Sequence, residues 1–178
     1  MPATKKPAAR KSPARRRSTR TSPDDAIALL KADHREVKHL FDEYKELVDS
    51  EGSPEDKQAV AEEICAALTV HAQIEEEIFY PAAKEALKEP DLVLEATVEH
   101  ATAKELIAQI ESMEPSDELY DAKVTVLGEY IDHHVKEEES EMFPKVRKAK
   151  LDLDGIGTQL ASRKAELTGA QVGEESAA

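Results

Sequence analysis

Two stretches of eleven residues, HAQIEEEIFYP at positions 71–81 and HVKEEESEMFP at positions 134–144, repeat one pattern. Aligned without gaps, both begin with His and have Glu four and five residues later, an aromatic residue at the ninth step and Pro at the tenth. Residues four apart lie one turn apart on the same face of a helix. Each copy therefore predicts a helix that presents a histidine and a carboxylate on one side and that ends or kinks near its proline.

Four helices are predicted around these copies, because apolar residues recur three and four positions apart. A Ser-Pro pair followed by acidic residues marks the start of the first two helices, at Ser22 and Ser53. The expected helices cover residues 22–50, 53–88, 91–114 and 116–144. Short connections between them predict an all-α fold, an up-down-up-down four-helix bundle over residues 23–150. Within the C-terminal segment 151–178, a short extra helix is expected at 154–167, followed by a flexible end.

One histidine stands in the apolar stripe of each predicted helix, and these are His34, His71, His100 and His134. A lone histidine in a core is more often a hydrogen-bonded structural residue than a ligand. Four of them, one per helix, change that weighting, because an antiparallel bundle can bring them to the same height. The sequence therefore predicts four imidazoles that converge on one internal point.

Two carboxylates share these stripes, with Glu75 one turn after His71 and Glu138 one turn after His134. A buried carboxylate is costly unless it is paired or binds a metal. Four neutral imidazoles and two carboxylates are six donors of the types that suit iron, manganese or zinc. Because a carboxylate can bridge two cations, the set predicts a dinuclear metal site. Three further residues are open as members of this site: Glu76, Glu139 and Tyr44.

The first 22 residues differ from the rest of the chain, since they hold eight of its 24 Lys and Arg and none of its 38 Asp and Glu. This basic tail, residues 1–22, has nothing to bury and is expected to be disordered. A cationic arm on an acidic body allows three interpretations. It contacts nucleic-acid phosphates without reading sequence, it associates loosely with its own acidic domain, or it is a targeting peptide.

Composition excludes several other classes of protein. No apolar run approaches the ~18–20 residues that cross a bilayer, and no apolar segment follows the first basic residues as in a secretory signal. The single Cys65 forms no internal disulfide, which fits a reducing compartment. Gly-rich phosphate loops and the G-x-S-x-G, C-x-x-C and H-E-x-x-H motifs are absent from the sequence. We therefore expect a cytoplasmic protein without membrane contact, and no particular oligomeric state is predicted.

The chain resembles the hemerythrin-like, or HHE cation-binding, family over roughly residues 24–148. The resemblance rests on ADHREV around His34, on EHATAKEL around His100 and on the two copies with their H-x-x-x-E pairs. It implies a four-helix bundle that holds two non-haem iron ions, bridged by carboxylate or oxo groups, on the six residues named above. Lys104 occupies the position at which oxygen-carrying members have a further histidine. Those members also have an Asp five residues after the fourth-helix histidine, whereas Glu138 lies four residues after His134. The ligand set is thus more similar to the bacterial HHE branch than to the oxygen carriers.

Known members of this family carry oxygen, sense oxygen, iron or nitric oxide, handle iron or consume peroxide. The resemblance therefore implies a protein that senses or handles iron, oxygen, nitric oxide or peroxide, in the setting of oxidative stress. Two alternatives stay open: a nucleic-acid-associated protein acting through residues 1–22, and a di-iron enzyme that decomposes peroxide. The plainest alternative is an acidic bundle with satisfied core histidines and an interaction role, but it leaves Glu75 and Glu138 unexplained.

Overall fold

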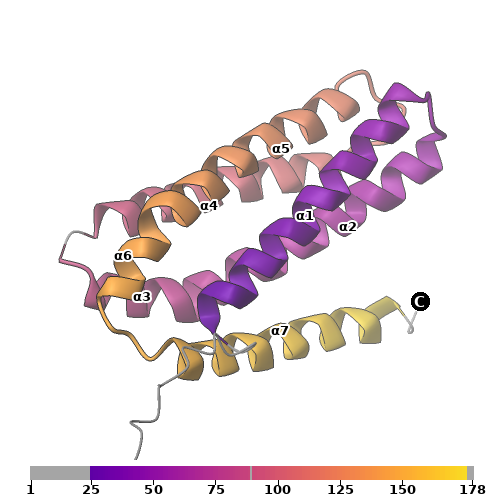
Figure 1. Cartoon of the computed structure of the whole chain (residues 1–178). Helices are drawn as coiled ribbons and strands as arrows, with labels where there is room; N and C mark the ends of the chain where they lie inside the picture. The colour runs from indigo at the N-terminus through magenta and orange to yellow at the C-terminus, as the bar shows by residue number, and fades with distance from the viewer. Residues whose placement is uncertain (1–24, 89, 176–178) are drawn as a thin grey trace, which may run out of the picture.

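The computed structural model describes residues 25–88 and 90–175, and all regular structure in this part of the chain is helical. Four helices run up and down beside one another (Figure 1): α1 (Ala26–Asp49), α2 (Pro54–Ile74), α4 (Asp91–Glu111) and α5 (Tyr120–Glu137). The all-α four-helix bundle expected from the sequence is confirmed. The predictions made for the basic tail, residues 1–22, lie outside the described residues.

Capping residues set the starts of the first two helices. Ser53 caps α2 as predicted, and its hydroxyl accepts a hydrogen bond from the backbone N–H of Asp56. The cap of α1 is Asp25, whose carboxylate accepts hydrogen bonds from two N–H groups in the first turn of the helix. The cap predicted at Ser22 falls outside the described residues. Asp25 also pairs with Arg147 at 3.0 Å, which ties the start of α1 to a later segment of the chain.

The starts of the other two bundle helices agree less well with the prediction from sequence. Helix α4 begins directly after Pro90, as predicted. Helix α5 begins at Tyr120 and not at Ser116, so the predicted start is wrong by four residues. The reason is a turn in which the Asp117 carboxylate accepts a hydrogen bond from the backbone N–H of Glu114. An Asp side chain that bonds nearby backbone in this way favours a turn over a helix.

A π-helical turn extends each helix that carries a copy of the repeat. Turn η1 (Glu75–Phe79) leads into α3 (Tyr80–Ala86), and η2 (Glu138–Met142) leads into α6 (Phe143–Lys148). The hydrogen bonds from Tyr80 N–H to the Glu75 carbonyl and from Phe143 N–H to the Glu138 carbonyl span five residues. The sequence predicts that Pro81 ends or kinks its helix, because proline lacks an N–H and crowds the preceding turn. The regular α-helix is interrupted there by the π turn, and the chain continues as helix to Ala86, close to the end predicted at residue 88.

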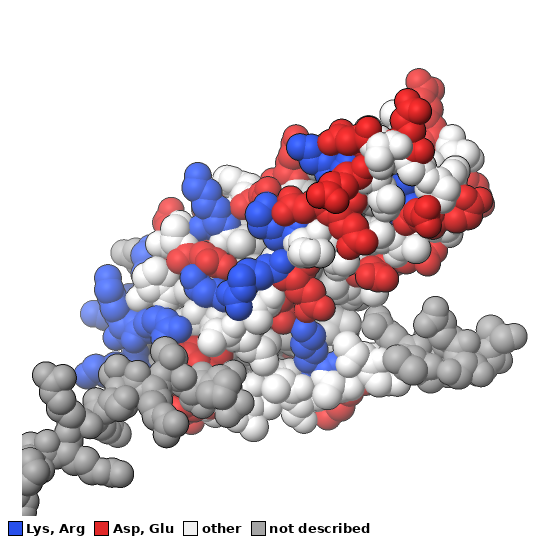
Figure 2. Space-filling model, turned by 45° about the vertical axis from the view of Figure 1, so that its right-hand side comes forward, with Lys and Arg blue, Asp and Glu red and all other residues white. Residues whose placement is uncertain are grey.

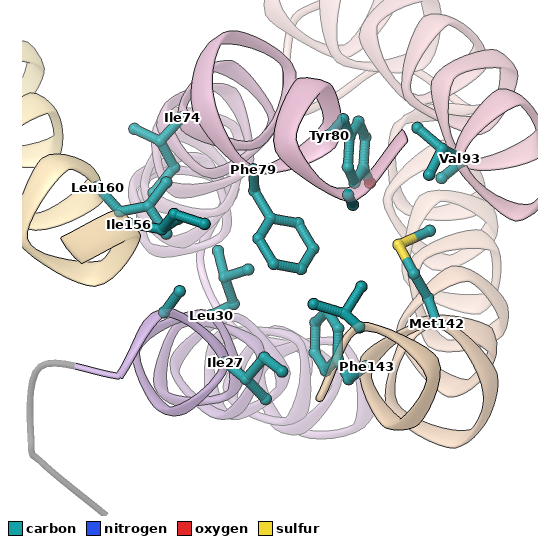
Figure 3. Packing of buried hydrophobic residues seen from close by; sticks show 14 residues of the cluster. Ile27, Leu30, Ile74, Phe79, Tyr80, Val93, Met142, Phe143, Ile156 and Leu160 are labelled. Carbon is teal, nitrogen blue, oxygen red and sulfur yellow. The ribbon is translucent and has the colours of Figure 1, made fainter. Parts of the chain in front are cut away.

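Helix α7 (Leu153–Glu175) lies outside the bundle, along α1 and α2 (Figure 1). It is longer than the short helix predicted at 154–167, and the part expected to be flexible is helical through Glu175. Its Ile156 and Leu160 are buried in the apolar core (Figure 3), and Arg163 pairs with Glu77 at 2.7 Å. Tertiary contacts of this kind stabilise a helix beyond what its own sequence predicts.

Two apolar clusters fill the interior, one on each side of a buried polar layer. The cluster near the prolines contains Phe79 and Phe143, whose rings meet edge to face with centroids 5.6 Å apart (Figure 3). The other cluster includes Ile64 and Leu127 and lies toward the turn between α1 and α2. All six predicted site residues lie between the clusters and are buried. The fold therefore places them in a dry environment, where electrostatic interactions are stronger than in water.

Charge is unevenly spread over the surface. Figure 2 shows Asp and Glu gathered at the end of the bundle where α1 turns into α2, with Lys and Arg more frequent toward the opposite end of the visible face. The last turn of α6, at that opposite end, contains Lys145, Arg147 and Lys148. Across the described residues, every helix is too short or too polar to cross a bilayer.

Candidate metal centre

The carboxylate of Glu75 stands between histidines from the two halves of the bundle. Its Oε2 lies 3.2 Å from Nε2 of His71, one turn back on the same helix, and 3.4 Å from Nε2 of His100 on α4. The side chain is fully buried, and turn η1 begins at this residue. An oxygen shared between two imidazoles of different helices is well placed to bridge two cations.

Glu138 occupies the equivalent place in the second copy of the repeat. Its Oε2 lies 3.3 Å from Nε2 of His34 on α1 and 3.6 Å from Nε2 of His134 on its own helix. The structure thus brings all six predicted residues together. Their ligand atoms form two groups that share Glu75, with the atoms of each group within 4.8 Å of one another: His34, His71, Glu75 and Glu138, and Glu75, His100 and His134.

Several atoms that face this centre have no hydrogen-bond partner. Within the described chain these buried atoms include Nε2 of His34 and of His71, Oε1 of Glu75 and Oε2 of Glu138. Leaving a buried polar atom unsatisfied costs about 1–3 kcal/mol, and more for a charged group. Unpartnered imidazole nitrogens and carboxylate oxygens that point into the same space are the donor set of a cation site. The residues present therefore fit a bound metal.

The opposite nitrogen of each histidine faces a carboxylate outside the centre. The Nδ1–oxygen distances are 3.0 Å for His34 to Glu139, 3.1 Å for His100 to Glu76, 2.7 Å for His134 to Glu99 and 3.5 Å for His71 to Asp33. Such a partner fixes the orientation of a ligating imidazole and leaves Nε2 free for the metal. His34, His100 and His134 are therefore held by hydrogen bonds with Nε2 directed inward. The contact between His71 and Asp33 is longer, and neither of its two atoms has a hydrogen-bond partner.

Lysines stand behind three of these four carboxylates. Lys31 lies 2.7 Å from Glu139, Lys104 lies 2.6 Å from Glu76, and Lys164 of α7 lies 2.8 Å from Asp33. Each lysine compensates the charge of a carboxylate that already faces a histidine. Lys104, which stands where the oxygen carriers have a further histidine, therefore has a role outside the centre.

Tyr80 is a member of the site that sequence reasoning missed. Its hydroxyl donates to Glu138 Oε1 at 2.9 Å, lies 3.3 Å from Glu75 Oε2 and stands 3.2 Å from Nε2 of His100. The sequence feature that could have identified Tyr80 is the ninth step of the repeat, where the first copy has this tyrosine and the second has Phe143. Burial, followed by the charges of the two glutamates, raises the pKa of Tyr80, so the phenol keeps its proton in the metal-free site.

In the absence of metal, the pKa values of the two buried carboxyl groups shift in opposite directions. Burial and the charge of Glu138 raise the pKa of Glu75 well above its usual value. Burial also acts to raise the pKa of Glu138, but the His34 imidazole, whose Nε2 lies 3.3 Å from Oε2, and the other nearby imidazoles outweigh it and lower that pKa to about 2. Without metal, Glu75 therefore takes up a proton at a higher pH than Glu138 does. A bound cation would favour the ionised form of both.

A small cavity adjoins the four imidazoles. Its volume is about 20 Å³, enough for one water-sized or diatomic molecule, and its other walls are mostly aliphatic side chains of the second apolar cluster. The histidines thus separate this apolar space from the two buried carboxylates. A small neutral molecule in the cavity would lie against the imidazole side of the centre.

The residues left open by the sequence fall outside the centre. Glu76 and Glu139 face Nδ1 of histidines, as described above, and are not aimed inward. The hydroxyl of Tyr44 donates to Asp121 at 2.8 Å, within the other apolar cluster. His39 and His133, the two histidines outside the four predicted helix stripes, both have exposed side chains. Burial raises the pKa of the Cys65 thiol to about 12, so the thiol keeps its proton at neutral pH.

A four-helix bundle with a layer of four histidines and two carboxylates at its centre defines a class of cation-binding helical proteins. Comparison with known proteins identifies the class more closely, since residues 25–146 match the Hemerythrin HHE cation binding domain family. The chain belongs to this family and is a metal-binding hemerythrin-like protein.

Two similar proteins support the assignment. A solved HHE cation binding domain-containing protein from Mycobacterium kansasii, described as an Rv2633c homolog, superposes with a TM-score of 0.69 at 25% identity. That match covers 83% of this chain and 90% of the other. A "DNA nickase" from Nostoc sp. (strain PCC 7120) is 32% identical over 119 residues, which are 67% of this chain. The chain spans 32% of the length of that curated relative.

Proposed function

We propose that this protein binds two non-haem iron ions in the buried centre and uses them to sense or handle oxygen, nitric oxide, peroxide or iron itself. The observation that carries the proposal is the set of unpartnered imidazole and carboxylate atoms that converge from both halves of the bundle. Imidazole and carboxylate together suit iron, and family membership favours iron over manganese or zinc.

The six residues have separate tasks in this proposal. Four imidazoles would ligate through Nε2, and carboxylates hydrogen-bonded to Nδ1 hold three of these rings in place. Glu75 and Glu138 would add carboxylate ligands and neutralise the cations, and Glu75 belongs to both candidate ligand groups. The apolar clusters on either side exclude water, which limits loss of metal. Iron, when bound, would supply an open coordination position and a change of redox state.

The small cavity and Tyr80 suggest where an external molecule is received. The cavity admits one small molecule beside the imidazoles. On the other side, the Tyr80 hydroxyl lies within hydrogen-bond distance of both carboxylates and of His100. A phenol that keeps its proton in a dry site is able to donate a hydrogen bond to an anionic oxygen species.

Metal analysis of the purified full chain tests the proposal directly. Protein reconstituted with ferrous iron under nitrogen should hold two irons per chain. Exposure to air should then produce a charge-transfer band in the visible or near-ultraviolet. A chain that takes up neither iron nor any other metal, and shows no spectral change in air, would falsify the proposal.

Peroxide decomposition is the enzymatic form of the same proposal. The iron-loaded protein would then evolve oxygen from peroxide, and Glu138→Ala would abolish that activity because it removes one carboxylate ligand. An oxygen-evolving activity that survives Glu138→Ala would argue against catalysis at this centre. Iron loading without oxygen evolution would leave sensing or storage as the function.

Contact with nucleic acid is a second candidate, favoured by two observations. The segment 1–22 holds eight Lys and Arg without an acid, and Asp25, the first described residue, pairs with Arg147 in the basic last turn of α6. A similar protein is also named a DNA nickase. In this proposal, residues 1–22 contact the phosphates of nucleic acid. The proposal also places the protein in the cytoplasm. A gel-shift assay with and without residues 1–22 should show binding that requires the arm, fades steeply with salt and lacks sequence preference.

A further inference from the structure

Another His-x-x-x-Glu pair, His133 and Glu137, lies beside the second copy of the repeat and points away from the centre. His133 and Glu137 each precede a residue of the inner pair, so a rotation of about 100° directs them to the surface. The Nε2 of His133 lies 3.3 Å from Glu137 Oε1 and 3.9 Å from Glu99 Oε1. These three side chains offer ligand atoms within 4.8 Å of one another.

Glu99 connects this surface group to the inner centre. Its Oε2 faces Nδ1 of His134 at 2.7 Å, while its Oε1 is directed toward His133. Only 15% of the Glu99 side chain is exposed, so its charge is poorly screened by solvent. A cation at the surface group would therefore be one carboxylate away from an inner ligand.

Comparison of the two halves of the bundle shows how the surroundings of Glu99 differ from those of Asp33. Glu99 precedes His100 as Asp33 precedes His34, and both face the Nδ1 of a partner histidine. Asp33, like Glu76 and Glu139, has a lysine behind it. By contrast, no Lys or Arg in the described part of the chain lies within 4.0 Å of Glu99 or Glu137. Where the other three carboxylates meet a cationic side chain, Glu99 meets a histidine and a second carboxylate.

We propose that Glu99, His133 and Glu137 form an outer site for a divalent cation that accepts nitrogen and oxygen ligands, such as zinc or ferrous iron. The ion takes the place that Lys164 has behind Asp33, and it compensates the charge of Glu99. A surface groove of about 530 Å³, lined by these three residues with Leu94, Glu95 and Val98, leaves room for water to complete the coordination. With three protein ligands and open access, the outer site binds more weakly than the inner centre and exchanges its ion freely.

Isothermal titration calorimetry of the full chain with zinc chloride tests this site. The chain is first saturated with zinc at its tight sites, excess metal is removed, and the titration is then repeated. One weaker binding event is expected in the wild type and should be lost in the double variant His133→Asn, Glu137→Gln. Both changes are at the surface, and Glu99 is kept because it contacts His134.

The chain offers a matched control in His39 and Glu43, an exposed His-x-x-x-Glu pair on α1 that belongs to none of the candidate ligand groups. The double variant His39→Asn, Glu43→Gln should keep the weak event. Absence of the event in the wild type, its survival in the His133 and Glu137 variant, or its equal loss in the control would each overturn the proposal.

Two further measurements distinguish a failure of this inference from a failure of the proposed function. The number of tight sites is counted in the same experiment, so failure of the inner centre is distinguished from failure of the outer one. Zinc should also shift the imidazole proton resonances of His133 in the wild-type chain while those of His39 stay in place. This measurement locates the ion without any variant, and unshifted His133 signals would contradict the proposal.

Discussion

The two halves of the bundle share a framework but differ in the side chains around it. The first half (α1, α2, η1 and α3) and the second half (α4, α5, η2 and α6) each supply two histidines, one buried glutamate and a π turn before a proline. At the ninth step of the repeat, Tyr80 reaches both glutamates and His100, whereas Phe143 stacks on His34 with ring centroids 5.9 Å apart. The shared residues are the candidate metal ligands, and the residues that differ give each side of the centre its own surroundings.

The second difference is the cover on each half. Helix α7 packs along α1 and α2 and brings Lys164 to Asp33, while the equivalent carboxylate of the second half, Glu99, opens onto a surface groove. A nearly symmetric core is therefore enclosed on one side and accessible on the other. Variants that make the halves alike, or more unlike, show which differences matter for function.

The largest effect is expected from Glu75→Gln. Because Glu75 belongs to both candidate ligand groups, its loss should lower metal content at both positions, as measured by elemental analysis of the reconstituted chain. Glu77→Gln is the matched control, since Glu77 lies in the same EEE run but pairs with Arg163 on the outside. Equal metal content in Glu75→Gln and wild type would contradict the assignment of Glu75.

Tyr80→Phe makes the first half resemble the second at the ninth step. The variant should bind metal as the wild type does but react with peroxide about a hundredfold more slowly, the scale on which a positioned proton donor contributes to rate. Stopped-flow spectroscopy of the iron-loaded proteins measures this. An unchanged rate with unchanged iron content would show that the hydroxyl only fills space.

Phe143→Tyr tests the reverse exchange. The new hydroxyl would enter the fully buried Phe143 position in the apolar cluster, so the free energy of unfolding should fall by about 1–3 kcal/mol. Urea unfolding of the metal-free chain, compared with wild type, measures the change. No loss of stability would mean that the second half also offers a partner for a phenol.

Lys164→Met and Lys104→Met compare an enclosed support with an exposed one. Asp33 is 8% exposed beside Lys164, whereas Glu76 is 32% exposed beside Lys104, so solvent screens the second pair more strongly. Lys164→Met should weaken metal binding about tenfold, in the range seen for outer partners of ligands, and Lys104→Met should weaken it less. Competition with a chelator ranks them, and the opposite order would refute the argument from burial.

The smallest expected difference is in proton uptake by the metal-free chain. Burial acts to lower the pKa of His34, but the adjacent carboxylates of Glu138 and Glu139 outweigh it and raise that pKa above its usual value. Burial and the neighbouring His134 lower the pKa of His100 to about 4. As the pH falls, therefore, His34 takes up its proton first, and His100 takes up a proton only near pH 4. An NMR titration that finds both histidines titrating together would contradict this.

Sequence reasoning found the parts of the molecule that follow from spacing along one helix. The bundle, the six inner residues and the cap at Ser53 all depend on positions three or four apart, and these are confirmed as neighbours in the structure. The role of Tyr80 depends on a π turn that changes the register before Pro81, which simple helical spacing does not contain. Helix α7 was predicted too short because its stability comes from burial against other helices and not from its own pattern.

The π turns also bear on how this centre tolerates change in chain length. Each π turn accommodates one residue more than an α turn, because the N–H of Tyr80 bonds the carbonyl five and not four residues back. An α-helix advances about 100° per residue, so converting η1 into an α turn with no residue removed would rotate everything after it by that angle and turn the Tyr80 phenol away from the two glutamates. Deleting one residue between Glu75 and Tyr80 would instead close the turn and leave α3 nearly in its present orientation, so the centre tolerates a shorter chain here better than a regular helix of the same length.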